Sequence, residues 1–289
     1  MSSSQRTSPQ PSAETPTAPD HTGSRASRII GGLTIAGLAT LLLFAFVLSP
    51  PDERVVDGRI IGQYDAVRML YVHFPSILIA YLGFTVCAAG SAMYLWRKSD
   101  WWDTVAGASG EIGTLFLGLT LVTGSIWGKP IWNTWWEWGD VRLMTTLMLF
   151  LMFLGYIAVR SLDVDRTVRA KRSAIVALIA VLNIPLVSQS VTWWEDRTLH
   201  QQSAATRDGI YYQDLTLFTL FLGFVVFALL FTWLLIHRFR VGWLELQIDR
   251  YGYEAALAER RAEAAAGVEA AIGAGDRTDN IGPDGGTDQ

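Results

Sequence analysis

The sequence has little charge and almost no cysteine. Only 17% of its 289 residues are Asp, Glu, Lys or Arg, and Cys87 is the single cysteine. One cysteine cannot form an intramolecular disulfide, and without a Cys/His spacing it does not indicate a zinc site. Because Cys87 lies within a long apolar run, we expect it to pack in the core rather than to carry redox chemistry.

Motifs of nucleotide-driven and hydrolytic enzymes are also missing. The sequence contains no glycine-rich phosphate loop, no GxSxG elbow and no HExxH motif. It has no clear internal repeat either, which favours one domain over a tandem array. The net charge of −4 is carried largely by the two ends and excludes no class of partner.

The sequence is rich in long apolar runs. Hydrophobic residues make up 51% of it, and six runs approach the roughly 20 residues that a helix needs to cross a bilayer. They are Ile29 to Leu48, Ile77 to Trp96, Ile112 to Trp127, Leu143 to Val159, Ala174 to Val191 and Leu215 to Ile236. The third and fourth are short for a full span. The sequence therefore predicts an all-α integral membrane protein with six transmembrane helices, the first retained rather than cleaved because a long polar leader precedes it.

The distribution of Lys and Arg predicts the orientation, since cytoplasmic flanks carry the excess. One set of flanks holds Arg25, Arg28, Arg97, Lys98, Arg160, Arg166, Arg169, Lys171, Arg172, Arg238 and Arg240. The other set holds fewer, namely Arg54, Arg59, Arg68, Lys129, Arg142, Arg197 and Arg207. We therefore expect a multi-pass protein of the plasma (inner) membrane with both termini in the cytoplasm.

The two ends differ in composition from the apolar centre. Met1 to Gly23 is rich in Ser, Thr and Pro, and Gly273 to Gln289 is rich in Gly and Asp; such segments bury too little apolar surface to offset the entropy of ordering. We expect a disordered cytoplasmic leader (residues 1–28), a six-helix membrane domain (29–240), and a cytoplasmic helix followed by an acidic disordered tail (241–289). Within the last part, Glu245 to Ala271 has helical composition.

The segment Ser125 to Met144, SIWGKPIWNTWWEWGDVRLM, joins two of the apolar runs. It carries five of the twelve tryptophans, Trp127, Trp132, Trp135, Trp136 and Trp138, and ends with Asp140 and Arg142. Tryptophan supplies a wide apolar surface at low conformational-entropy cost and suits planar aromatic ligands. Under the predicted topology this loop lies outside the membrane, between the third and fourth helices.

Two of the four histidines lie on the same predicted face as the loop. His21 falls in the leader, and His237 adjoins Arg238 and Arg240, where a basic interfacial anchor explains it. His73 and His200 instead flank the second and fifth helices on the outer side. Ionisable groups at a membrane are costly and so indicate function.

Two neutral imidazoles beside an aromatic surface can supply both axial ligands of a haem iron. The tryptophans would cover the porphyrin, and Lys129 and Arg142 are the nearest cations that could pair with its propionates. We expect Asp140 to orient an indole N–H or Arg142.

Ordinary explanations exist for each residue alone. A loop histidine can be solvated, and interfacial tryptophans commonly form a belt at headgroup depth. A permease subunit of a transporter would need no haem, and its polar groups would lie at mid-membrane, where Asn183, Pro185 and Gln189 form the one such cluster; Pro185 is there expected to kink the helix. A haem-bearing quinone oxidoreductase would place histidine pairs within the span. The coincidence of three features on one face favours haem handling.

Three segments resemble one family. They are RMLYVHFPS around His73, the WGKPIWNTWWEWGDVRLM loop, and VTWWEDRTLHQ before and including His200. Together they resemble the haem-handling membrane proteins of cytochrome c biogenesis, and most of all the cytochrome c maturation protein C (CcmC) family. The resemblance covers roughly residues 28–240 and leaves both tails out.

The resemblance implies six helices that hold haem b as cargo on the outer face, with His73 and His200 as axial ligands. The platform role falls on Trp127, Trp132, Trp135, Trp136 and Trp138, with Asp140 and Arg142 ending the signature. It implies an extracytoplasmic haem chaperone, ATP-binding cassette subunits of the cytochrome c maturation system and membrane lipid as partners, and no nucleic acid. It also implies haem binding and transfer rather than catalysis.

Two departures from the family pattern stand out. This chain has Gly139 between Trp138 and Asp140, one residue more than the usual Trp-x-Trp-Asp-x-Arg, and Glu195, Asp196 and Arg197 lengthen the segment before His200. A loop absorbs an extra residue at small entropic cost.

Overall fold

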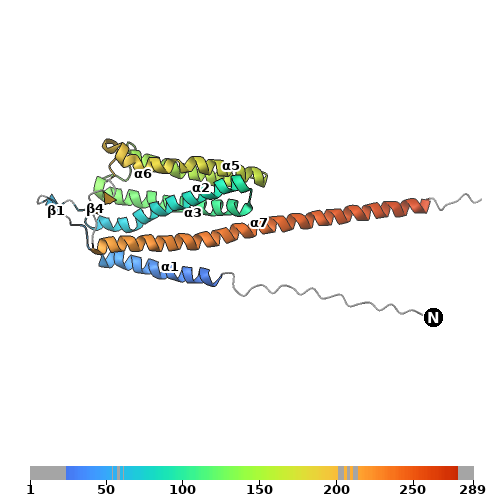
Figure 1. The fold of residues 1–289 in the computed structure, drawn as a ribbon, viewed down its shortest axis with the longest axis horizontal. Coiled ribbons are helices and arrows are strands. Elements are labelled where there is room, and N and C mark those ends of the chain that lie inside the picture. Colours follow the sequence, from blue (N-terminus) through green and yellow to red (C-terminus); the bar gives the residue numbers. More distant parts are fainter. Residues whose placement is uncertain are drawn as a thin grey trace, which may run out of the picture.

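The computed structural model describes residues 24–53, 55–56, 59–60, 62–200, 205–206, 209–210 and 214–278. Most of the predicted disordered leader (1–23, with His21) and the end of the acidic tail (279–289) lie outside the described residues. The prediction is wrong for Arg25 to Arg28, which begin the first helix, α1 (Arg25–Leu43). The rest of the chain is almost entirely helical (Figure 1).

Seven α-helices make up the described chain. They are α1 (Arg25–Leu43), α2 (Leu70–Arg97), α3 (Asp100–Trp132), α4 (Val141–Arg160), α5 (Arg166–Val181), α6 (Asn183–Trp193) and α7 (Asp214–Thr278). Short segments join them: the π-helical turn η1 (Phe44–Leu48) and the 3-10 turns η2 (Asp65–Met69) and η3 (Glu195–Arg197). Two antiparallel hairpins lie in the loops, β1 (Val55–Val56) with β2 (Arg59–Ile60) and β3 (Ala205–Thr206) with β4 (Gly209–Ile210).

Six helical segments of the described chain are long and apolar enough to cross a membrane, which confirms the predicted all-α membrane fold. They are Arg25–Leu48, Asp65–Arg97, Asp100–Trp132, Val141–Arg160, Arg166–Trp193 and Asp214–Gly252. The prediction that the third span is short is wrong. It is 33 residues long, because it begins at Asp100 instead of Ile112. The added turns contain Thr104, Ser109 and several Gly and Ala, which lower their hydropathy, yet they are buried against the other helices.

The helices form one bundle with two ends (Figure 1). We call one end the tryptophan end: α3 and α6 finish there, α4 and α7 begin there, and the Trp127 to Asp140 segment lies there. At the other end, called the arginine end, α2 and α4 finish with Arg97 and Arg160, and α5 begins with Arg166. Helices α2 and α3 form the centre and pack on each other along much of their length, and α1 packs on α7.

Glycines allow α2 and α3 to approach closely. A Cβ added to Gly83 on α2 would lie 2.9 Å from the Cα of Gly113 on α3, and one added to Gly113 would lie 2.8 Å from the Phe84 ring. Small residues at a helix crossing let two backbones come together in a membrane, where packing rather than the hydrophobic effect drives association. The free Cys87 lies buried beside the same contact, next to Gly110, which confirms its expected packing role.

The fifth span is broken where proline predicted a kink. Helix α5 ends at Val181 and α6 begins at Asn183, two residues before Pro185. The Asn183 side-chain amide donates a hydrogen bond of 3.0 Å to the Thr145 carbonyl on α4. Of the polar residues predicted at mid-membrane, Asn183 therefore joins two helices.

Helix α7 continues far beyond the bundle (Figure 1). The helical composition of Glu245 to Ala271 is confirmed, since both lie within the single helix Asp214–Thr278. The prediction that disorder begins at Gly273 is wrong for Gly273 to Thr278, which remain helical. One glycine in a helix costs about 1 kcal/mol relative to alanine, and the alanine-rich turns before it extend the helix past that position.

We predict that Gly83→Ala destabilises the bundle by about 1–3 kcal/mol, the usual cost of overpacking, because its methyl group would meet the Gly113 backbone. Thermal unfolding in detergent, followed by tryptophan fluorescence, measures the change. Gly155→Ala on α4 is the matched control, since a Cβ there meets no atom within 4 Å. Equal unfolding temperatures for the two variants would contradict the close crossing.

Candidate functional site at the tryptophan end

His73 lies in the first turn of α2 and points at α3. Its Nδ1 is 3.2 Å from the Thr123 Oγ1. The Thr123 hydroxyl lies 2.7 Å from the Leu119 carbonyl, to which it can donate, and its oxygen can then accept from the Nδ1–H tautomer of His73. This tautomer leaves the lone pair on Nε2, the arrangement that a metal-binding histidine needs.

The surroundings of His73 hold its ring in place. A Cβ at Gly124 would lie 2.9 Å from the His73 Cε1, so only glycine leaves room for the ring against α3. The Trp127 ring stands edge-on to the imidazole, with 5.4 Å between centroids. The Trp127 indole N–H donates to the Gln63 Oε1 at 3.0 Å. The Trp127 ring, which flanks the imidazole, is therefore held in place by a hydrogen bond of its own.

His200 lies beside a second tryptophan of the same helix end. The His200 and Trp132 ring centroids are 6.0 Å apart. The additional residues Glu195 to Arg197 form the 3-10 turn η3, which closes with a bond from the Arg197 N–H to the Trp194 carbonyl. The added length is thus taken up in a turn before the histidine.

Asp140 joins this histidine segment to α4. It is 1% exposed, and its Oδ1 accepts the Leu143 N–H at 2.8 Å as the N-cap of α4. Its Oδ2 accepts the Leu199 N–H at 2.6 Å and the Thr198 hydroxyl at 3.0 Å. The expected indole N–H and Arg142 guanidinium are not among these hydrogen-bond partners, although the carboxylate does interact electrostatically with Arg142. A buried carboxylate with three donors is well satisfied, and here it fixes the chain just before His200.

The additional Gly139 is accommodated without moving Asp140 from the helix start. Trp138 and Gly139 form a turn, and the Gly139 N–H donates to the Glu137 Oε1 at 3.1 Å. Trp138 and Trp135 are 72% and 58% exposed, while the Trp136 and Trp138 rings meet edge-to-face. Part of the tryptophan surface is therefore free to contact another molecule.

Several polar groups near the site have no protein partner among the described residues. The buried Trp136 indole N–H and Tyr81 hydroxyl make no hydrogen bond there. The Arg142 guanidinium forms no ion pair or hydrogen bond with them either, although Tyr81, His73 and the Asp140 carboxylate are near enough to interact with its charge. Buried polar groups without partners are uncommon in folded proteins and fit a site for a polar or anionic ligand group.

Lys129 is held differently from Arg142. Its Nζ donates to the Asn133 carbonyl at 3.1 Å, where α3 ends with Asn133 in the left-handed region (φ 58°). Lysine can donate three hydrogen bonds, so this contact leaves it able to bind a ligand as well. Its observed contact is with the end of α3.

The structure thus brings the predicted site residues to one end of the bundle. His73 meets Trp127, His200 meets Trp132, and Asp140 connects to the residues before His200. Sequence reasoning missed the supporting residues Gln63, Thr123, Gly124, Thr198 and Tyr81. The pair Thr123 and Gly124 lies just before the tryptophan segment, but nothing in the sequence indicates that it faces His73.

These features define a class: a multi-pass α-helical membrane protein with two histidines set against tryptophans at one end. A family model described as "Heme exporter protein C" (CcmC) matches residues 12–252. The chain therefore belongs to the Heme exporter protein C family, which confirms the resemblance seen in the three segments. The extension of α7 past Gly252 lies beyond the matched region.

Individual proteins similar in sequence to this chain support the same family. Heme exporter protein C of Haemophilus influenzae is 33% identical over 229 residues, which cover 78% of this chain and 88% of that protein. The protein of the same name from Bradyrhizobium diazoefficiens is 34% identical over 186 residues, 63% of this chain and 66% of that protein. A "Putative cytochrome c biosynthesis ccmC-like mitochondrial protein" of Marchantia polymorpha is 34% identical over 168 residues, 58% of this chain and 70% of that protein.

We predict that Asp140→Ala speeds amide hydrogen exchange at both Leu143 and Leu199 by about tenfold or more. Loss of an N-cap costs about 1 kcal/mol and loss of a charged hydrogen bond about 1.5–3 kcal/mol, and 1.4 kcal/mol is a factor of ten. Asp165→Ala is the control, because Asp165 caps α5 through the Val168 N–H. It should affect Val168 alone. Unchanged exchange at Leu199 in Asp140→Ala would contradict the bridging role.

Proposed function

We propose that this protein handles haem for c-type cytochrome biogenesis: it binds haem at the tryptophan end, with His73 and His200 as axial ligands, and transfers it to a haem chaperone. Membership of the Heme exporter protein C family supports haem handling. The haem, proposed to be haem b, is cargo. The protein itself catalyses no reaction in this proposal.

The observation that carries the proposal is the contact between His73 Nδ1 and the Thr123 hydroxyl. When Nδ1–H donates to the Thr123 hydroxyl oxygen, the lone pair lies on Nε2, where it is available to iron. Iron-bound histidines commonly donate the other ring N–H in this way, which orients the ring and raises its basicity.

The remaining residues fit the other parts of a haem. Trp127, Trp132, Trp135, Trp136 and Trp138 would cover the porphyrin. The Arg142 guanidinium, together with the Tyr81 hydroxyl and the Trp136 indole N–H, could receive the propionates, since a carboxylate accepts hydrogen bonds and prefers a guanidinium partner. Lys129 could add a second cation. Asp140 would act at a distance by fixing the backbone before His200.

Ligation by two histidines leaves no open position on the iron, which suits holding and transfer and disfavours oxygen chemistry. A quinone oxidoreductase would need haem ligands distributed through the span for electron transfer across the membrane, whereas both histidines lie at one end. A permease would use polar groups at mid-membrane, and the Asn183 amide there is already bonded to α4.

The proposal includes a location and partners. The tryptophan end faces outward from the plasma membrane, because the arginine end carries the larger number of Lys and Arg; both termini are then cytoplasmic. The exposed Trp135 and Trp138 would meet an extracytoplasmic haem chaperone. ATP-binding cassette subunits of the cytochrome c maturation system are the other proposed partners.

We predict a Soret band with low-spin, six-coordinate features for the detergent-purified protein supplied with haem. His73→Ala and His200→Ala should each abolish the band or convert it to a five-coordinate spectrum. His237→Ala is the matched control, since His237 is bound to Ser27 at the arginine end and should leave the spectrum unchanged. A haem-free wild type, or identical spectra in all three variants, would contradict the assignment of His73 and His200 as haem ligands.

We also predict that Gly124→Ala weakens haem binding about 10–100-fold, the usual effect of disturbing a group that orients a metal ligand. The added methyl group would collide with the His73 ring and displace Nε2. A haem titration followed by absorbance measures the affinity. Gly155→Ala, which meets open space, should bind like the wild type; equal affinities for both variants would show that the His73 position is irrelevant to binding.

A further inference from the structure

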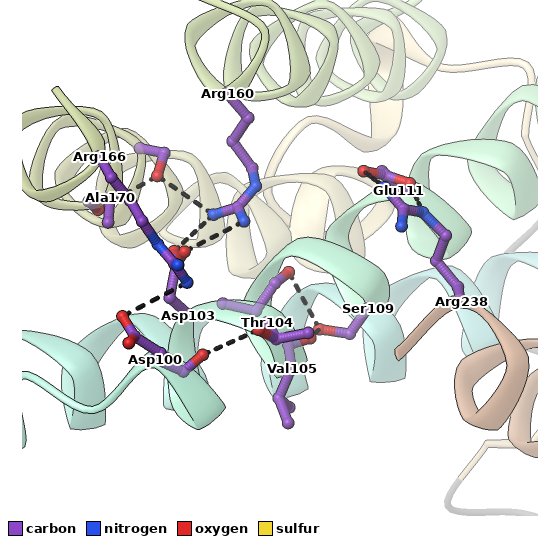
Figure 2. Close-up of polar contacts among 12 residues, drawn as sticks. Asp100, Asp103, Thr104, Val105, Ser109, Glu111, Arg160, Arg166, Ala170 and Arg238 are labelled. Atoms are coloured by element: carbon purple, nitrogen blue, oxygen red, sulfur yellow. Dashed lines mark hydrogen bonds and ion pairs between the residues drawn. The ribbon is translucent and has the colours of Figure 1, made fainter. Parts of the chain in front are cut away.

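A cavity of about 480 Å³ lies at the arginine end, between α3, α4, α5 and α7. Charged side chains from all four helices line it, and apolar atoms of Ala108, Ile157 and Leu246 complete its walls. It is far from the tryptophan end, and neither the family match nor the proposed haem site assigns it a role. Figure 2 shows the polar contacts of this region.

Two ion pairs neutralise the inner part of the cavity. Arg160 binds Asp103 through both of its terminal nitrogens, the shorter contact being 2.6 Å, and Arg238 binds Glu111 at 2.9 Å (Figure 2). Gly107 leaves room for the Arg160 guanidinium, because a Cβ there would lie 2.6 Å from it. A buried charge needs such a partner, so these four residues are already satisfied.

The two outer walls carry opposite charges that do not meet. Arg166 and Arg169 of α5 line one wall, and Glu245 and Asp249 of α7 line the other. Arg166 pairs with Asp100 at 3.4 Å (Figure 2). Within the described part of the chain, Arg169 and Asp249 have no ion-pair partner, and the one such contact of Glu245 is with Arg238, at 3.9 Å. A cation wall and an anion wall separated by a cavity favour a ligand that carries both charges.

The position of the cavity indicates a ligand at the membrane surface. Trp96 and Trp101, which end α2 and begin α3 at the same end of the bundle, are 73% and 45% exposed, and Arg97 and Lys98 lie beside them. Exposed Trp with flanking Lys and Arg marks the level of the lipid headgroups. The outer walls of the cavity therefore lie where a phospholipid presents its phosphate.

We propose that this cavity binds the headgroup of a zwitterionic phospholipid with a primary ammonium group. Arg169 receives the phosphate, with Arg166, which Asp100 holds, as the second cation of the wall, and Glu245 and Asp249 receive the ammonium. A phosphate alone would face the two carboxylates, and an amine alone would face the two guanidinium groups. The lining residues include no His, Met, Cys or Tyr, so the cavity offers no side chain of the kinds that ligate haem iron. The proposal is independent of the haem site.

Native mass spectrometry of the full-length, delipidated protein tests the proposal. The protein is reloaded from micelles that contain phosphatidylethanolamine, phosphatidylglycerol or phosphatidylcholine. We expect phosphatidylethanolamine to be retained about tenfold more strongly than the other two, since one charge-assisted hydrogen bond corresponds to about that factor. Equal retention of all three lipids in the wild type would overturn the proposal.

Substitutions on each wall separate the two charges. Arg169→Gln should reduce retention of phosphatidylethanolamine about tenfold, whereas Arg172→Gln, on an exposed part of the same helix and outside the cavity, should not. Combined Glu245→Gln and Asp249→Asn should make phosphatidylglycerol bind as well as phosphatidylethanolamine. Equal retention by Arg169→Gln and Arg172→Gln would contradict the site.

Two control measurements exclude misfolding and binding of a free headgroup. Each variant should keep the wild-type unfolding temperature and haem spectrum, so that a loss of lipid does not reflect misfolding. Soluble glycerophosphoethanolamine, which has the same charges without acyl chains, should fail to displace the lipid at equal concentration. Displacement would assign the cavity to a free zwitterion and overturn the lipid assignment.

Discussion

The close approach of α2 and α3 is the constraint on which the geometry of the tryptophan end depends. Gly83 and Gly113 let the two backbones meet near mid-span, and Gly124 lets the His73 ring rest on α3 two to three turns further along. Because the helices are already in contact at the crossing, the side chain of Thr123 reaches the imidazole with no intervening group. In a membrane, where lipid is as apolar as the core, such packing contacts and hydrogen bonds supply the stability. The same contact that stabilises the bundle therefore sets the chemistry of His73.

The second histidine is positioned by a different kind of interaction. His200 follows a helix that is broken at Leu182 and ends at Trp193, so helix packing alone would leave it loosely placed. The Asp140 carboxylate solves this by capping α4 with one oxygen and holding Thr198 and Leu199 with the other. A carboxylate is favourable at a helix N-terminus, and its burial makes the second set of bonds obligatory. The tryptophan segment and the His200 segment are therefore linked through one side chain.

The sequence predicted the parts of this architecture that depend on local pattern. Apolar runs predict spans because a bilayer has a fixed thickness, and Pro185 predicted the break in the fifth span. The start of α3 at Asp100 was missed because small and polar residues there are buried by neighbouring helices rather than exposed to lipid. The pairs Asp103 with Arg160 and His73 with Thr123 join residues 57 and 50 positions apart. No periodicity encodes such a pairing, since it follows from which faces of two helices meet.

The buried arginines have different partners at the two ends of the bundle. At the arginine end, Asp103 and Glu111 pair with Arg160 and Arg238, so that charges placed at membrane depth are neutralised within the protein. At the tryptophan end, Arg142 makes no ion pair or hydrogen bond through its side chain among the described residues, and Tyr81 and the Asp140 carboxylate are the groups near enough to act on its charge. A guanidinium without a hydrogen-bonded carboxylate keeps its donors for an anion. Arg142 differs in this respect from Arg160 and Arg238, and the proposed contact with a haem propionate would use that difference.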